Sequence, residues 1–175
     1  MSAKRFVAMQ ALGGGVINAV LNGFPALLIM GEETKWHLWN SFPSLVLDTC
    51  GMAFGIAWGT GWILTSQLRK QVASGKVTLP AREAFSARAQ KDLGNWPASA
   101  FHRGFNLGAL AVLLLALPVV GVMVATGVES WGRWPVFVFK SVFGAVVGAA
   151  FTPMVAVGVA VERPAVIEAV AASEG

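Results

Sequence analysis

Four long runs of this 175-residue chain contain almost no charged side chains. Residues 6–30 and 104–128 contain no Asp, Glu, Lys or Arg, residues 38–68 contain only Asp48, and residues 135–161 contain only Lys140. Each run is longer than the roughly 20 apolar residues that a helix needs to cross a bilayer. Because a backbone in lipid must satisfy its hydrogen bonds internally, each run is expected to form a helix.

The composition favours the same fold class. Charged residues make up only 13% of the chain, against about 25% in soluble domains. We therefore predict an all-α integral membrane four-helix bundle, with spans at about 6–30, 43–66, 100–126 and 135–160. The expected organisation is a first transmembrane hairpin (1–68), a basic cytoplasmic linker with a short amphipathic helix (69–99), and a second hairpin with a C-terminal tail (100–175).

The basic residues indicate an orientation for these spans. Most lysines and arginines lie in the N-terminal lead, in the long middle segment and just after the fourth run, whereas the other two connections hold few. Because basic residues are retained on the cytoplasmic side, we predict a multi-pass protein of the cytoplasmic (inner) membrane with both termini in the cytoplasm. The formal net charge of +4 follows from this distribution, so nucleic acid is not an expected partner.

The phrase Trp-x-x-x-Pro occurs twice, 92 residues apart, and each copy stands just before an apolar run. One copy runs from Trp39 to Pro43 and the other from Trp131 to Pro135. Each Trp is expected to anchor at the outer membrane interface, and each Pro to lie in the first turn of the following helix. The chain is therefore interpreted as two tandem hairpins. Since each unit has an even number of spans, the copies are parallel and their axis runs along the membrane normal.

Each unit consists of a basic start, an apolar helix, a short loop with Trp and a second apolar helix. It resembles the small bacterial two-helix membrane proteins of unknown function, here duplicated in tandem. The resemblance covers most of the chain and implies a hairpin fold. It carries no active site, and no functional residue is assigned from it.

The same offset pairs Asp48 with Lys140 and Thr49 with Ser141. An isolated charge inside a membrane costs several kcal/mol unless it is paired or solvated, so we hypothesise an ion pair between spans 2 and 4. Three interpretations remain open. The pair is a structural clamp that fixes helix register, Lys140 snorkels to the headgroups without a partner, or the position is an ion, proton or substrate site. Polar residues that could line such a site are Thr49, Ser141, Asn18 and Asn22.

Small residues predict where helices approach closely. Glycines recur every four residues in span 2, at Gly51, Gly55 and Gly59, and in span 4, at Gly144 and Gly148. Such spacing is typical of helix packing in membranes. A run of three glycines at 13–15 is interpreted in the same way, in preference to a broken, ligand-binding helix.

The middle segment holds a short amphipathic pattern at 78–94, in which Ala81, Phe85, Ala89 and Leu93 recur every four residues among basic side chains. This pattern favours a helix lying on an anionic membrane surface, with docking on a partner as the alternative.

No catalytic constellation is visible in the sequence. His37 and His102 fall on opposite sides of the predicted membrane, and Cys50 has no intrachain partner. We therefore expect no metal, no cofactor and no enzymatic activity. Two functions remain: an accessory or scaffold protein that associates through glycine-rich helix faces, or a small oligomeric transporter or channel component that uses the depth of Asp48 and Lys140. Besides the lipid bilayer, the expected partners are further copies of the chain or a partner membrane subunit.

Overall fold

The computed structural model describes residues 2–32, 34–39, 42 and 44–162. Most of the chain is helical, which confirms the predicted all-α class. In chain order the elements are α1 (Ala3–Ile29), β1 (Trp36–His37), α2 (Leu45–Gly59), the π-helical η1 (Thr60–Leu64), α3 (Thr65–Ala73), the 3₁₀ turn η2 (Arg82–Ala84), α4 (Ala87–Gly94), α5 (Ala100–Ala111), the π-helical η3 (Val112–Ala116), α6 (Leu117–Ala125), β2 (Ser130–Trp131) and α7 (Arg133–Ala160).

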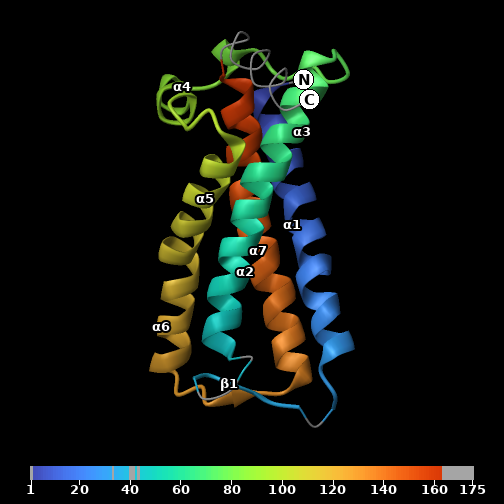
Figure 1. Ribbon diagram of the computed structural model, residues 1–175, viewed down its shortest axis with the longest axis vertical. Helices are drawn as coiled ribbons and strands as arrows, with labels where there is room; N and C mark the ends of the chain where they lie inside the picture. The colour runs from blue at the N-terminus through green and yellow to red at the C-terminus, as the bar shows by residue number, and fades with distance from the viewer. Residues whose placement is uncertain (1, 33, 40–41, 43, 163–175) are drawn as a thin grey trace.

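Four long helical rods stand side by side (Figure 1): α1, the continuous α2–η1–α3, the continuous α5–η3–α6, and α7. Three of these rods are long and apolar enough to cross a membrane, namely Ala3–Ile29, Ala100–Ala125 and Arg133–Ala160. The α2–η1–α3 rod is not among the three. It carries Asp48 in its first turn and Arg69 and Lys70 near its end.

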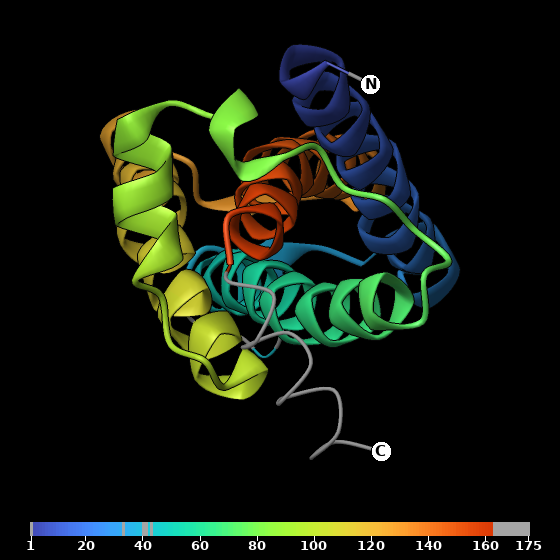
Figure 2. The same cartoon turned by 90° about the horizontal axis from the view of Figure 1, so that it is seen from above.

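The α7 helix is the centre of the bundle. In its most apolar stretch 67% of the residues are buried, against 22% for α1. Figure 2 shows α7 surrounded by α1, the α2–α3 rod and α5. The α1 helix lies along α7, and α2 with η1 lies along α5. Each helix therefore packs mainly against a helix of the other hairpin, so the two halves of the chain interlock.

Glycines on α1 and α7 allow these two helices to touch. A methyl group added at Gly144 would press on the backbone carbonyl of Asn18, and one at Gly148 would press on that of Gly14. The α1 helix runs unbroken through the glycines at 13–15, of which Gly14 and Gly15 face α7 and Gly13 meets no atom within 4 Å. Close approach of the two backbones fits the packing role expected for these small residues.

A two-residue antiparallel ladder pairs Trp36 with Trp131. It joins the loop between α1 and α2 to the loop between α6 and α7, at the end of the rods where α7 begins. The repeat alignment of the sequence pairs Trp39 with Trp131, but in the ladder the partner of Trp131 is Trp36. Trp131 is half-buried with its ring centroid 5.2 Å from that of Phe139, whereas Trp39 is exposed. Pro135 lies in the first turn of α7 as expected, and Pro43 lies outside the described residues.

The linker helix is shorter than the sequence predicts. The chain turns at Phe85, and Ser86 then caps α4 by accepting a hydrogen bond from the Ala89 amide at 3.2 Å. Phe85 is buried in a cluster with Phe6 and Leu68, and Ala89 and Leu93 pack at its edge. Part of the predicted stripe therefore packs against the chain's own helices, whereas Ala81 is exposed and the placement of α4 on a membrane surface stays a prediction.

Candidate functional site

The ion pair between Asp48 and Lys140 joins the start of α2 to the first turns of α7. Ser44 caps α2 by accepting a hydrogen bond from the Leu47 amide, which places Asp48 in the first turn, where the helix dipole favours a carboxylate. Lys140 Nζ donates to Asp48 Oδ1 at 2.6 Å. The side chain of Lys140 is 12% exposed and that of Asp48 is 18% exposed, so both are mostly buried.

An aromatic ring covers the pair. Lys140 Nζ lies 5.1 Å from the ring centroid of Trp36, which is itself buried. A cation over the face of an indole is stabilised by the ring quadrupole. The ammonium therefore has two partners, the carboxylate and the ring, and the β1–β2 ladder holds the ring in place. Sequence reasoning did not place Trp36 beside Lys140, because the repeat aligns Trp39, and not Trp36, with Trp131.

The other polar residues expected at this depth do not join the pair. Thr49 is fully buried and its hydroxyl donates to the Leu45 carbonyl of its own helix at 2.6 Å. Ser141 lies against Gly23 of α1. Asn18 and Asn22 donate to carbonyls one turn earlier in α1, at 2.8 and 2.9 Å. The structure therefore brings together Asp48 and Lys140 but builds no single polar path from the set.

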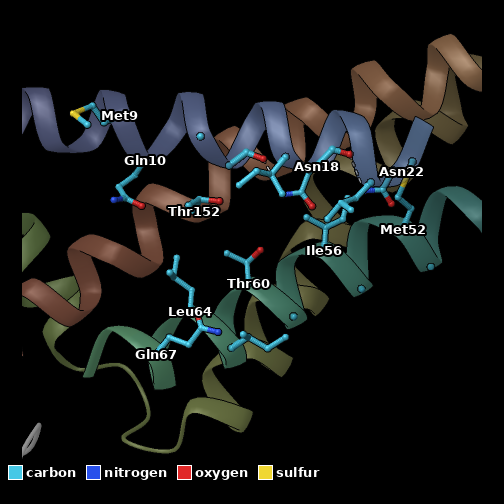
Figure 3. Close-up of a pocket in the computed structure, with 18 residues that line it drawn as sticks. Met9, Gln10, Asn18, Asn22, Met52, Ile56, Thr60, Leu64, Gln67 and Thr152 are labelled. Atoms are coloured by element: carbon cyan, nitrogen blue, oxygen red, sulfur yellow. Dashed lines mark hydrogen bonds between the residues drawn. The ribbon is translucent and has the colours of Figure 1, made fainter. Parts of the chain in front are cut away.

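A groove of about 830 Å³ separates α1 from the α2–η1–α3 rod (Figure 3). Gly51, Gly55 and Gly59 line its α2 side, and a methyl group at any of the three would meet no atom within 4 Å. No other helix of the described chain packs against these three glycines, so their predicted role in helix packing stays a prediction about a partner helix. Because α1 lies along α7 instead, the face that they form is left open.

Amides and hydroxyls are spaced along this groove. Figure 3 shows Gln10, Asn18 and Thr60 extending into the space between the helices. Thr152 of α7 also lines the groove and is only 8% exposed, and its hydroxyl has no hydrogen-bond partner among the described residues. The groove is thus largely apolar, with a few hydrogen-bonding groups along its length.

The part of the chain that the structure describes holds no group of three or more His, Cys, Asp or Glu side chains that could bind a metal ion. No protein-family model, curated protein or solved structure matches this chain. Its function is therefore argued from its own geometry.

Proposed function

We propose that this protein is a four-span integral membrane protein with an accessory or scaffolding role, and that it binds one membrane-spanning helix of a partner subunit in the groove between α1 and α2. The open face of Gly51, Gly55 and Gly59 is the observation that carries the proposal. Glycines at intervals of four let a second helix approach backbone to backbone. In this chain no described residue occupies the space in front of them.

The dimensions of the groove favour a helix as the occupant. Its lining on the second rod extends from Gly51 to Gln67, which is about 24 Å at roughly 1.5 Å per residue. That length approaches the roughly 30 Å thickness of the hydrocarbon layer. The groove runs along the rods, so its occupant lies parallel to them. Thr152 offers a hydroxyl that an incoming polar side chain or backbone carbonyl can use.

The surface of the bundle supports its placement in a membrane. Large apolar side chains of α1 are exposed on the side away from α7, among them Leu12, Val16, Val20 and Leu28. A continuous exposed apolar surface of this kind is unfavourable in water. The basic residues of the α3–α4 side support a cytoplasmic location for both termini of the chain, in the inner membrane.

The transporter or channel alternative has weaker support. Transport needs polar groups along one path. Asp48 and Lys140 instead bond to each other beside the Trp36 ring. Thr49 bonds within α2, and Asn18 lies in the groove, away from the pair. The ion pair is better explained as the structural clamp, since it fixes the register of α2 against α7.

The decisive experiment compares Gly55→Leu with Gly121→Leu. Neither position has an atom within 4 Å of an added methyl group, so both variants are expected to fold, but only Gly55 lines the groove. The proteins are extracted from their own membranes in mild detergent and weighed by native mass spectrometry. The wild type and Gly121→Leu are expected to carry a partner subunit, and Gly55→Leu is expected to lose it.

A partner retained by Gly55→Leu, or a wild type that is monomeric in every detergent, would refute the proposal. A homo-oligomer that dissociates in Gly55→Leu would replace the partner subunit by a second copy of the chain. Substrate-dependent flux in liposomes that disappears in Asp48→Asn would favour the transporter.

A further inference from the structure

A second pocket, of about 420 Å³, lies at the end of the bundle where α3 and α7 end and α5 begins. Among the described residues that line it, Arg69, Arg82, Lys91 and Arg103 are cationic, and Glu162 is the single carboxylate. The formal charge of this lining is +3. We call it the arginine pocket. It is separate from the groove between α1 and α2, with which it shares no lining residue.

One carboxylate serves two buried guanidinium groups in this pocket. Arg69 donates to both oxygens of Glu162, from Nε and Nη2, at 2.9 Å each. Arg103 Nη2 also contacts Glu162 Oε1. The side chains of Arg69 and Arg103 are 1% and 2% exposed, and that of Glu162 is 5% exposed. A net positive charge is therefore buried, and burial of an unbalanced charge is strongly unfavourable.

Some of the hydrogen-bonding capacity of these arginines is unused. Arg69 Nη1 donates to the Ala98 carbonyl at 2.7 Å, but Nε and Nη1 of Arg103 are buried without a hydrogen-bond partner among the described residues. Arg82 Nε donates to Gln90 Oε1 at 3.3 Å. The two terminal nitrogens of Arg82 have no partner among the described residues. Lys91 is exposed at the pocket rim. Buried donors of this kind normally have partners.

We propose that the arginine pocket binds a phosphate group, supplied either by the headgroup of an anionic phospholipid or by a soluble phosphate. Phosphate has the negative charge that the lining lacks, and its oxygens match the forked donors of arginine. The pocket lies at the depth of a headgroup, because Arg103 is in the first turn of the apolar stretch Ala100–Ala125. Trp96, whose ring lies 5.6 Å from Arg103 Cζ, is a residue type enriched at that level.

Two double variants with equal loss of charge test this proposal. Arg82→Gln with Lys91→Gln removes two cations of the pocket, and neither residue is buried. Lys76→Gln with Arg88→Gln removes two exposed cations of the same cytoplasmic segment that do not line it. The full-length proteins, delipidated in a maltoside detergent, are titrated with phosphatidylglycerol, with phosphatidylcholine and with inorganic phosphate. Native mass spectrometry counts bound lipids, and calorimetry measures phosphate binding.

The wild type and the control variant are expected to bind one phosphatidylglycerol more tightly than any phosphatidylcholine. The pocket variant is expected to bind it at least about tenfold more weakly, because charge-assisted contacts are lost. Saturable binding of inorganic phosphate that competes with the lipid would assign the site to soluble phosphates, and lipid binding without phosphate binding would assign it to the headgroup. Equal affinities in the two double variants, or no preference for an anion in the wild type, would overturn the proposal. The outcome is independent of the partner helix, since the groove and the arginine pocket share no lining residue.

Discussion

Lys140 Nζ lies 2.6 Å from Asp48 Oδ1, although the two residues are 92 positions apart in the chain. Arg69 and Glu162, which are 93 positions apart, form the same kind of link at the opposite end of the α2–α3 and α7 rods. Ion pairs thus join the α2–α3 rod to α7 at both ends. An ion pair within the apolar interior fixes which turn of one helix faces which turn of the other.

Removal of one charge at the Asp48–Lys140 pair is expected to destabilise the bundle. Asp48→Asn and Lys140→Met each leave a mostly buried partner charge, at a cost on the order of 3 kcal/mol. The exchange of both residues, Asp48→Lys with Lys140→Asp, is expected to recover part of that loss, because the pair reforms but the ammonium leaves the Trp36 ring. Unfolding by sodium dodecyl sulfate in mixed micelles, followed by circular dichroism, measures all three. An exchanged protein as unstable as the sum of the single variants would show that the pair has no coupling energy.

Glu162→Gln is expected to be costly, on the order of 3 kcal/mol, because Glu162 is the only carboxylate among the described residues that contacts the buried Arg69 and Arg103. The matched control is Glu83→Gln, since Glu83 is exposed and makes no hydrogen bond or ion pair with the described residues. The same detergent unfolding assay compares them. Similar stabilities for the two variants would contradict the assigned role of Glu162.

Gly148→Ala and Gly121→Ala are expected to change stability in opposite directions. The methyl group of the first would press on the Gly14 carbonyl and the Asn18 amide, and such overpacking costs about 1–3 kcal/mol. The second adds a methyl group in open space within α6, where Ala is favoured over Gly by up to about 1 kcal/mol. Unfolding midpoints decide between these outcomes. A neutral Gly148→Ala would mean that α1 and α7 move apart at little cost.

Phe85→Ala is expected to loosen the linker, because Phe85 is 8% exposed and fills the cluster with Phe6 and Leu68. Loss of a buried phenyl ring typically costs about 3 kcal/mol. Phe42→Ala is the control, since Phe42 is 91% exposed and its truncation should cost little. Limited proteolysis of the 74–99 segment, together with unfolding, gives the readout. If Phe85→Ala resists the protease as well as Phe42→Ala, the linker does not depend on this contact.

Sequence reasoning was accurate where the property is local. The span predicted at 6–30 corresponds to Ala3–Ile29, that at 100–126 to Ala100–Ala125, and that at 135–160 to Arg133–Ala160. The second rod begins near its predicted start but continues as helix into α3. The Asp48–Lys140 pair was also predictable, because few charges lie in the runs and the repeat aligns these two. The sequence also indicated the pair of Arg69 and Glu162. Each residue follows directly after an apolar run, and the two are 93 positions apart, close to the 92-residue offset of the repeat.

The glycine faces show where the reasoning could not succeed. Gly51, Gly55 and Gly59 have the same spacing as Gly144 and Gly148, yet the first set lines an open groove and the second set packs against α1. Spacing defines a face of one helix but not its neighbour. The same limit applies to Phe85. The four-residue spacing of its stripe predicted an apolar face but did not show which residues that face would contact.

The sequence by itself determined where the four long rods lie in the chain and which end carries the basic residues, because these follow from runs of apolar side chains and from the placement of charge. Only the tertiary structure decided that α1 packs on α7 and α2 on α5, which opens the groove and gathers Arg69, Arg103 and Glu162 in one pocket. Helix pairing depends on the shapes of two surfaces in contact, and that information is divided between segments far apart in the chain.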